Sequence, residues 1–159
     1  MPPVTIRLVF DEDTVALLRN MPDDYVNQPP VALEEDLFEQ VVTLNINGER
    51  LIRRQLVPVL YLAVSGLDVL EALAAGPQKL EIPGDGFLVF RLSGQLVTID
   101  SPSYGHASVD YTEILDVWRL FYKRAKQFVL ECFPRAGEHP LVAQWFLTHD
   151  STPTEPKAL

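Results

Sequence analysis

The sequence predicts an α+β domain built on a mostly antiparallel sheet of about five or six strands, with two main helices packed on one face. Short segments alternate apolar and polar residues beside tight-turn signals, and two longer segments repeat apolar residues every three or four positions. The chain has 159 residues and 47% hydrophobic content, which suffices to bury one core. We expect a single domain over residues 1–148, followed by a flexible C-terminal tail at residues 149–159.

The chain opens with a strand at Val4 to Phe10, where apolar residues occupy alternate positions. Residues Val15 to Arg19 fit either a helical turn or a second strand. The stretch from Asn20 to Leu33 has three prolines and no clear periodicity. A loop of this length in a compact domain usually serves a function or is disordered.

A strand is expected from Leu37 to Ile46. It should form a β-hairpin with the residues that follow, because Asn47-Gly48 is a strong signal for a two-residue turn. That loop length would pair two sets of residues across the strands: Leu44 with Leu51, and Thr43 with Ile52.

The first main helix is predicted from Leu56 to Ala75, with Pro58 in its first turn and Gly76 as its stop. Its first half is apolar on nearly every side. Such a helix is either central to the core or covered by a partner.

Further strands are predicted at Leu80 to Ile82, Phe87 to Leu92, Gln95 to Asp100 and Tyr104 to Val109. A two-residue turn at Ser93-Gly94 would pair three sets of residues: Leu88 with Ile99, Phe90 with Val97, and Leu92 with Gln95.

The second main helix is expected to begin after Asp110, which has the spacing of an N-cap with Glu113 three residues later, and to end before Pro134. Its apolar stripe predicts eight buried residues: Ile114, Leu115, Trp118, Phe121, Ala125, Phe128, Val129 and Cys132. A short helix from Leu141 to Phe146, with Trp145 packed inward, would complete the domain.

The motifs of nucleotide binding and of hydrolytic nucleophiles are missing from the sequence, and the three histidines lack the spacing of metal ligands. Asp11 and Asp13 resemble the start of a calcium loop, but Ala16 and Pro22 stand where such a loop needs glycine and a carboxylate. Cys132 lies on an apolar stripe, which favours a structural thiol. We therefore expect no metal and no cofactor, and we assign no catalytic residue.

One group of side chains could still form a general acid/base cluster if the fold brought them together: His106, Tyr104, Asp85 and Asp100. An ordinary hydrogen-bonded histidine is the simpler interpretation. The alternative is a small enzyme or small-molecule-binding protein with a pocket between sheet and helix near Tyr104 and His106.

Acidic charge is concentrated at one end of the sequence. Ten of the 22 acidic residues lie in the first 49 positions, opposed by two arginines, so this part carries −8 of the formal net charge of −9. Such a field attracts cationic surfaces and repels nucleic acid and anionic membranes. Arg119, Lys123, Arg124 and Lys126 give the second helix a cationic face, which we interpret as a solvated surface.

These features predict a non-catalytic binding protein that engages a basic protein partner, with no nucleic acid or membrane as partner. In a bacterium, its concrete form would be an immunity or inhibitor protein that neutralises a cationic toxin. The expected contact residues are Asp11, Glu12, Asp13, Asp23, Asp24, Tyr25, Glu34, Glu35 and Asp36. A homodimeric scaffold joined through the first main helix is a further alternative. One cysteine and no visible signal segment favour the cytoplasm.

Overall fold

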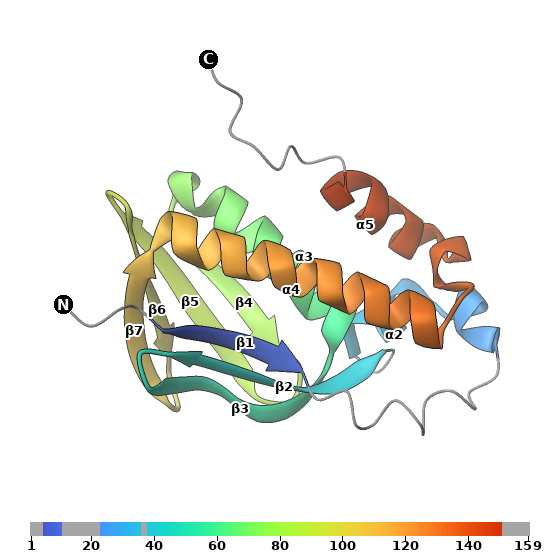
Figure 1. Cartoon of the computed structure of the whole chain (residues 1–159), viewed down its shortest axis with the longest axis horizontal. Helices are drawn as coiled ribbons and strands as arrows, with labels where there is room; N and C mark the ends of the chain where they lie inside the picture. Colours follow the sequence, from blue (N-terminus) through green and yellow to red (C-terminus); the bar gives the residue numbers. More distant parts are fainter. Residues whose placement is uncertain (1–4, 11–22, 36–37, 151–159) are drawn as a thin grey trace, which may run out of the picture.

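A computed structural model describes residues 5–10, 23–35 and 38–150, and these residues form an α+β fold with two antiparallel sheets (Figure 1). Sheet A has the order β1-β2-β3, with β1 at Ile6–Phe10, β2 at Glu39–Ile46 and β3 at Glu49–Pro58. Sheet B has the order β4-β5-β6-β7, with bounds Gln78–Ile82, Gly86–Ser93, Leu96–Ser101 and Gly105–Asp110. The α+β class is confirmed. The prediction of one sheet with five or six strands is wrong, because β4 pairs with β5 and not with the earlier strands.

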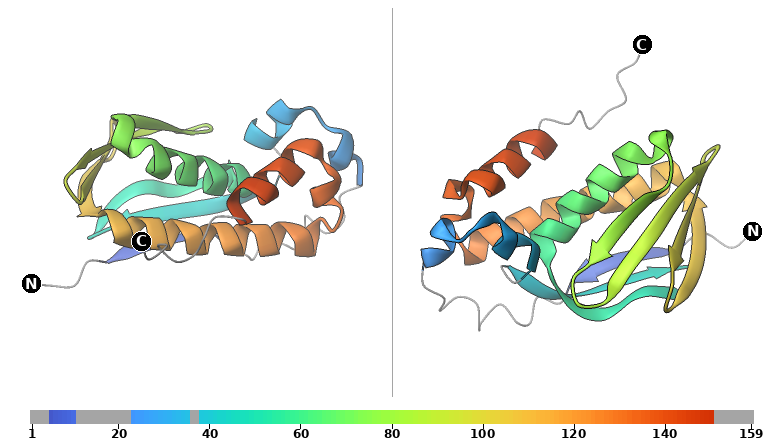
Figure 2. Two further views of the ribbon diagram at one scale, coloured as in Figure 1. Left: turned by 90° about the horizontal axis from the view of Figure 1, so that it is seen from above. Right: turned by 180° about the vertical axis from the view of Figure 1, so that it is seen from behind.

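Two long helices, α3 at Val59–Ala72 and α4 at Tyr111–Cys132, lie side by side over the sheets (Figure 2). Helix α4 contacts β1 of sheet A and α3 contacts β4 of sheet B, so the pair closes the space between the two sheets. The shorter helical elements are η2 (Asp23–Asn27), α2 (Pro30–Glu35), η3 (Leu73–Ala75), η4 (Ala136–Glu138) and α5 (Pro140–Asp150).

The apolar surface of α3 is compatible either with a central place in the core or with a covering partner, and the structure places the helix at the centre of the core. Nine of its residues are buried within the chain itself. The helix begins after Pro58, which is its N-cap, whereas Leu56 belongs to β3 and is 48% exposed. A dimer joined through the apolar face of this helix would therefore lack the exposed surface that it needs.

Helix α4 follows its sequence signals closely. The Asp110 side chain accepts a hydrogen bond from the Thr112 backbone N–H at 3.0 Å, and the helix ends at Cys132, two residues before Pro134. Seven of the eight expected residues are buried, and Tyr122 joins them. Cys132 is only partly buried, because it lies in the last turn of the helix.

The first hairpin has the expected turn, with positive φ at Asn47 and Gly48, but its register changes further along the strands. Strand β3 contains two bulges, so Leu44 pairs with Ile52. The predicted pairs of Leu44 with Leu51 and of Thr43 with Ile52 are therefore wrong.

The second hairpin turns at Gly94-Gln95, one residue later than predicted. Phe90 therefore pairs with Ile99, and Leu92 with Val97. The register differs from the prediction by two residues, and since side chains alternate with a period of two, the apolar face is unchanged.

The C-terminal helix is longer than its sequence pattern indicates. Helix α5 runs to Asp150, so His149 and Asp150 belong to it and not to a tail. His149 is buried, and its Nε2 lies 3.3 Å from the Asp68 carboxylate of α3. The remainder of the expected tail lies outside the described residues.

Candidate functional site

Most of the expected acidic contact residues can be placed only by their backbone. Asp23 and Asp24 begin η2, and Glu34 and Glu35 end α2. Asp11, Glu12, Asp13 and Asp36 lie outside the described residues. Helices η2 and α2 lie together at one end of the molecule, near η4 (Figure 2).

Tyr25 was expected among the partner-binding residues, and the structure instead places it in the core with 2% exposure. Its ring packs edge to face against Phe38 and Phe133, at centroid distances of 5.9 and 5.2 Å. Its hydroxyl oxygen accepts a hydrogen bond from the Arg135 backbone N–H at 3.0 Å. The ring is therefore not available to a partner, and Tyr25 acts as an anchor for η2.

A second contact fixes the same segment. The ring of His139, itself buried, is hydrogen-bonded through Nε2 to the Gln28 carbonyl at 2.8 Å, and Leu33 of α2 is buried in the core. The stretch without periodicity is thus a pair of short helices from Asp23 to Glu35. Their acidic positions are carried on an anchored backbone.

The suspected acid/base cluster is only partly assembled. The Tyr104 hydroxyl donates a hydrogen bond to Asp85 Oδ1 at 2.8 Å, where the β4–β5 and β6–β7 turns meet. His106 is exposed on β7, opposite Asp100 in the ladder, and Asp100 accepts a hydrogen bond from Arg91 at 2.7 Å. The four residues therefore lie in two separate pairs at the rim of sheet B, Tyr104 with Asp85 and His106 opposite Asp100.

Tyr104 acts as a structural link between neighbouring segments. Its hydrogen bond to Asp85 raises the pKa of Tyr104, which makes the hydroxyl a weaker acid. The guanidinium of Arg53, from sheet A, lies 4.4 Å from the centroid of its ring. Tyr104 thereby joins the rims of the two sheets.

The cationic face of α4 borders a cavity of about 410 Å³ between α3, α4 and α5. Arg119, Lys123 and the half-exposed Leu120 line it from α4, and His149 and Asp150 line it from α5. Lys126 forms an ion pair with Asp150, so part of this face holds α5 in place.

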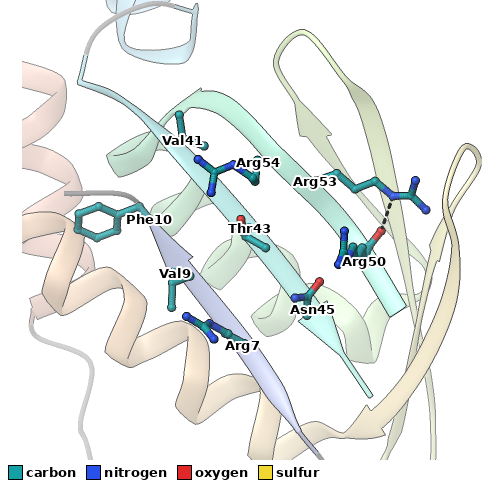
Figure 3. Close-up of a pocket in the computed structure, with 9 residues that line it drawn as sticks. All are labelled: Arg7, Val9, Phe10, Val41, Thr43, Asn45, Arg50, Arg53 and Arg54. Carbon is teal, nitrogen blue, oxygen red and sulfur yellow. Dashed lines mark hydrogen bonds between the residues drawn. The ribbon is translucent and has the colours of Figure 1, made fainter. Parts of the chain in front are cut away.

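A larger cavity, of about 570 Å³, lies on the outer face of sheet A (Figure 3). Four of its nine lining residues are arginines, and none of the nine is acidic. They are Arg7, Val9, Phe10, Val41, Thr43, Asn45, Arg50, Arg53 and Arg54. We call Arg7, Arg50, Arg53 and Arg54 the arginine face.

Sequence reasoning missed the arginine face. Three of its residues follow the hairpin turn within six positions, but the strand pattern alone predicts only a returning strand there. In a regular strand, Arg53 and Arg54 would point to opposite sides of the sheet. Both are exposed here because of a bulge in β3.

Comparisons with known proteins give no relative: the chain matches no protein-family model, and no curated protein and no solved structure matches it. Within the described ranges, no three His, Cys, Asp or Glu side chains gather as a metal site would require. In the same part of the chain, no helix has the length and apolar character needed to cross a bilayer.

Proposed function

We propose that this chain is a non-catalytic binding protein that engages a basic protein partner through its acidic first third. The observation that carries the proposal is the anchoring of the segment from Asp23 to Glu35. Tyr25 and Leu33 are buried and His139 holds the Gln28 carbonyl, so four acidic positions stand on two short helices fixed to the core. A preorganised segment loses less conformational entropy when it binds than a free loop does.

The negative charge of the first third favours a positively charged partner. The first 49 residues carry −8 of the net charge of −9. A concentrated negative field speeds the approach of a cationic protein and disfavours anionic partners. An inhibitor of a basic toxin, such as a nuclease with a cationic substrate cleft, is the concrete form that fits these features.

The alternatives have less support. His106 is exposed and Tyr104 is engaged with Asp85, which does not favour a small enzyme at this position. The apolar surface of α3 is covered by the chain itself, which does not favour a scaffold dimer through that helix.

The test compares charge reversals on the two oppositely charged surfaces. A basic partner is captured from the native host, and its association rate is measured with the parent chain, with Asp23→Lys plus Asp24→Lys, and with Glu34→Lys plus Glu35→Lys. Both variants should bind more slowly at low salt, and the difference should shrink as salt screens the charges over about 10 Å at 0.1 M.

Lys123→Glu with Arg124→Glu is the control, because both residues are exposed and belong to α4, not to η2 or α2. If the control variant abolishes binding while the acidic reversals leave the rate unchanged, the proposed surface is wrong.

A further inference from the structure

The cavity of about 410 Å³ between α3, α4 and α5 has a firmly held wall. Its α5 side is the last turn of that helix, which lies next to α4 (Figure 2). Asp150 accepts a hydrogen bond from the Tyr122 hydroxyl at 2.8 Å and forms an ion pair with Lys126. The His149 ring is buried, and its Nε2 lies 3.3 Å from the Asp68 carboxylate of α3. These contacts join α5 to both long helices, so the cavity is formed before a ligand binds.

Side chains of both charge signs line this cavity. Arg119 and Lys123 lie one helical turn apart on α4, while Glu71 of α3 and Asp116 of α4 bring two carboxylates. In the part of the chain that the structure describes, none of these four side chains forms an ion pair. The remaining carboxylate of the lining, on Asp150, is already paired. Two positive and two negative charges therefore border one space, and a ligand that carries both charges can pair with all of them.

The lining also has an apolar part. Leu67 of α3 is buried in the wall, and Leu120 of α4 is 51% exposed. The other large apolar residues of α4 are buried or partly buried, so Leu120 is an exception on its helix. An apolar group that lies against these two leucines leaves water, which favours binding.

We propose that this cavity binds a small zwitterion with an apolar side chain, of the class of free α-amino acids such as leucine. The ligand carboxylate pairs with Arg119 and Lys123, whose N–H groups form charge-assisted hydrogen bonds. The ligand ammonium group pairs with Glu71 and Asp116, and its side chain lies against Leu120. A volume of about 410 Å³ is in the range of small-molecule sites. The lining includes no residue of η2 or α2, so this site is separate from the acidic surface proposed above to bind a protein.

A ligand with a single charge fits this lining less well. A simple carboxylate would add a negative charge close to Glu71 and Asp116. An amine would add a positive charge close to Arg119 and Lys123. Like charges at short range disfavour a complex, so the lining selects for a ligand whose two charges are both matched.

Isothermal titration calorimetry of the full chain at neutral pH tests the proposal with ligands that share one carbon skeleton. Leucine carries both charges, 4-methylpentanoate lacks the ammonium group, and 3-methylbutylamine lacks the carboxylate. Leucine should bind, and each of the other two should bind about tenfold more weakly or worse, because one set of charged contacts is lost. Glycine keeps both charges and lacks the side chain, so it should also bind more weakly than leucine.

Substitutions then locate the ligand. Arg119→Gln should weaken leucine binding by about tenfold, and Glu71→Gln should do the same from the opposite helix. Arg124→Gln and Glu131→Gln are the matched controls, because they remove the same charges from exposed positions of α4 outside the lining. Both controls should leave the affinity unchanged. Circular dichroism checks that each variant is folded.

Four results would overturn the proposal. The first is that leucine, methionine and phenylalanine all fail to bind at millimolar concentration. The second is that 4-methylpentanoate or 3-methylbutylamine binds as tightly as leucine, since the site would then not use both charges. The third is equal affinity for glycine and leucine, which would show that the apolar part is not used. The fourth is an unchanged affinity in Arg119→Gln or Glu71→Gln, or an equal loss in the controls, because the ligand would then lie elsewhere.

Discussion

Single side chains decide how closely the two long helices of this protein approach. Trp118 of α4 is fully buried, and its indole N–H donates to the Ala63 carbonyl of α3 at 3.1 Å. The ring lies directly against Gly66, where a Cβ atom would come within 1.9 Å of it. Glycine weakens a helix interior by roughly 1 kcal/mol relative to alanine, so Gly66 is tolerated because it makes room for the tryptophan.

Gly66→Ala should therefore destabilise the protein although alanine favours helices. The added methyl group meets a rigid indole ring, and overpacking of this kind typically costs about 1–3 kcal/mol. Urea denaturation gives the measurement. Trp118→Phe, combined with Gly66→Ala, should recover part of the loss, because the smaller ring leaves space for the methyl group.

Gly137→Ala is the matched control for this prediction. The added Cβ would meet its nearest neighbour, the Phe146 ring, at 3.8 Å, which is an ordinary contact. Its free energy of unfolding should stay within about 0.5 kcal/mol of the parent. Equal effects at the two glycines would show that α3 and α4 can separate without cost.

Among the elements, α5 depends on a few polar contacts. The Tyr122 hydroxyl donates to Asp150 at 2.8 Å, and the ring of His149 lies 5.6 Å from the Tyr122 ring. Burial, followed by the hydrogen bond to Asp150, raises the pKa of Tyr122 well above its usual value of 10.0. The neutral hydroxyl is the form that the folded state favours.

This shift predicts how stability depends on pH. Since the pKa of Tyr122 is raised on folding, its contribution is present below pH 10 and decreases as pH rises above that value. Tyr122→Phe should cost about 1 kcal/mol near neutral pH, through the lost hydrogen bond. It should also lose less stability than the parent between roughly pH 8 and 11. Identical losses in urea denaturation over that interval would contradict the assignment.

The cap of α4 leads to a prediction at acidic pH. Hydrogen bonds from Thr112 lower the pKa of Asp110. A lowered pKa stabilises the fold above its usual value of 3.8, and this contribution disappears as pH falls through the folded value. Asp110→Ala should therefore lower the Tm at neutral pH, and the difference from the parent should shrink below pH 3.8. Asp110→Asn should lower the Tm less, since asparagine is also a good N-cap.

How far the sequence predicts these elements depends on whether the signal is local. The capping residue, the Asn47-Gly48 turn and the stripe of α4 are local signals, and each correctly predicts its feature. The bulges in β3 are not local, because they depend on how β3 packs against the rest of sheet A and its core. The arginine face depends on one of these bulges, which is why alternation alone could not predict it. The acidic residues beside Tyr25 predict an exposed ring, whereas the ring packs against Phe38 and Phe133, which are distant in the sequence.

The whole molecule is held together by aromatic rings that cross from one sheet to the other. Phe10 of sheet A contacts Phe121 of α4 at 6.0 Å, and Phe121 contacts Trp118 at 6.2 Å. Trp118 in turn contacts Phe90 of sheet B at 6.2 Å. Two sheets that share no ladder thus share one core, and this predicts that they unfold together.

The last prediction tests this shared core. The chain has two tryptophans, so Trp145→Phe leaves Trp118 as the only one, at the centre of the aromatic chain. In urea, the fluorescence of Trp118 and the far-ultraviolet circular dichroism of this variant should give the same midpoint, because neither sheet can lose its contact with α4 alone. Leu8→Ala in sheet A and Leu88→Ala in sheet B remove buried side chains far from the tryptophan in sequence, and each should cost about 2–5 kcal/mol. Each should shift both signals equally. A fluorescence midpoint that moves with Leu88→Ala but not with Leu8→Ala would show that the sheets unfold separately.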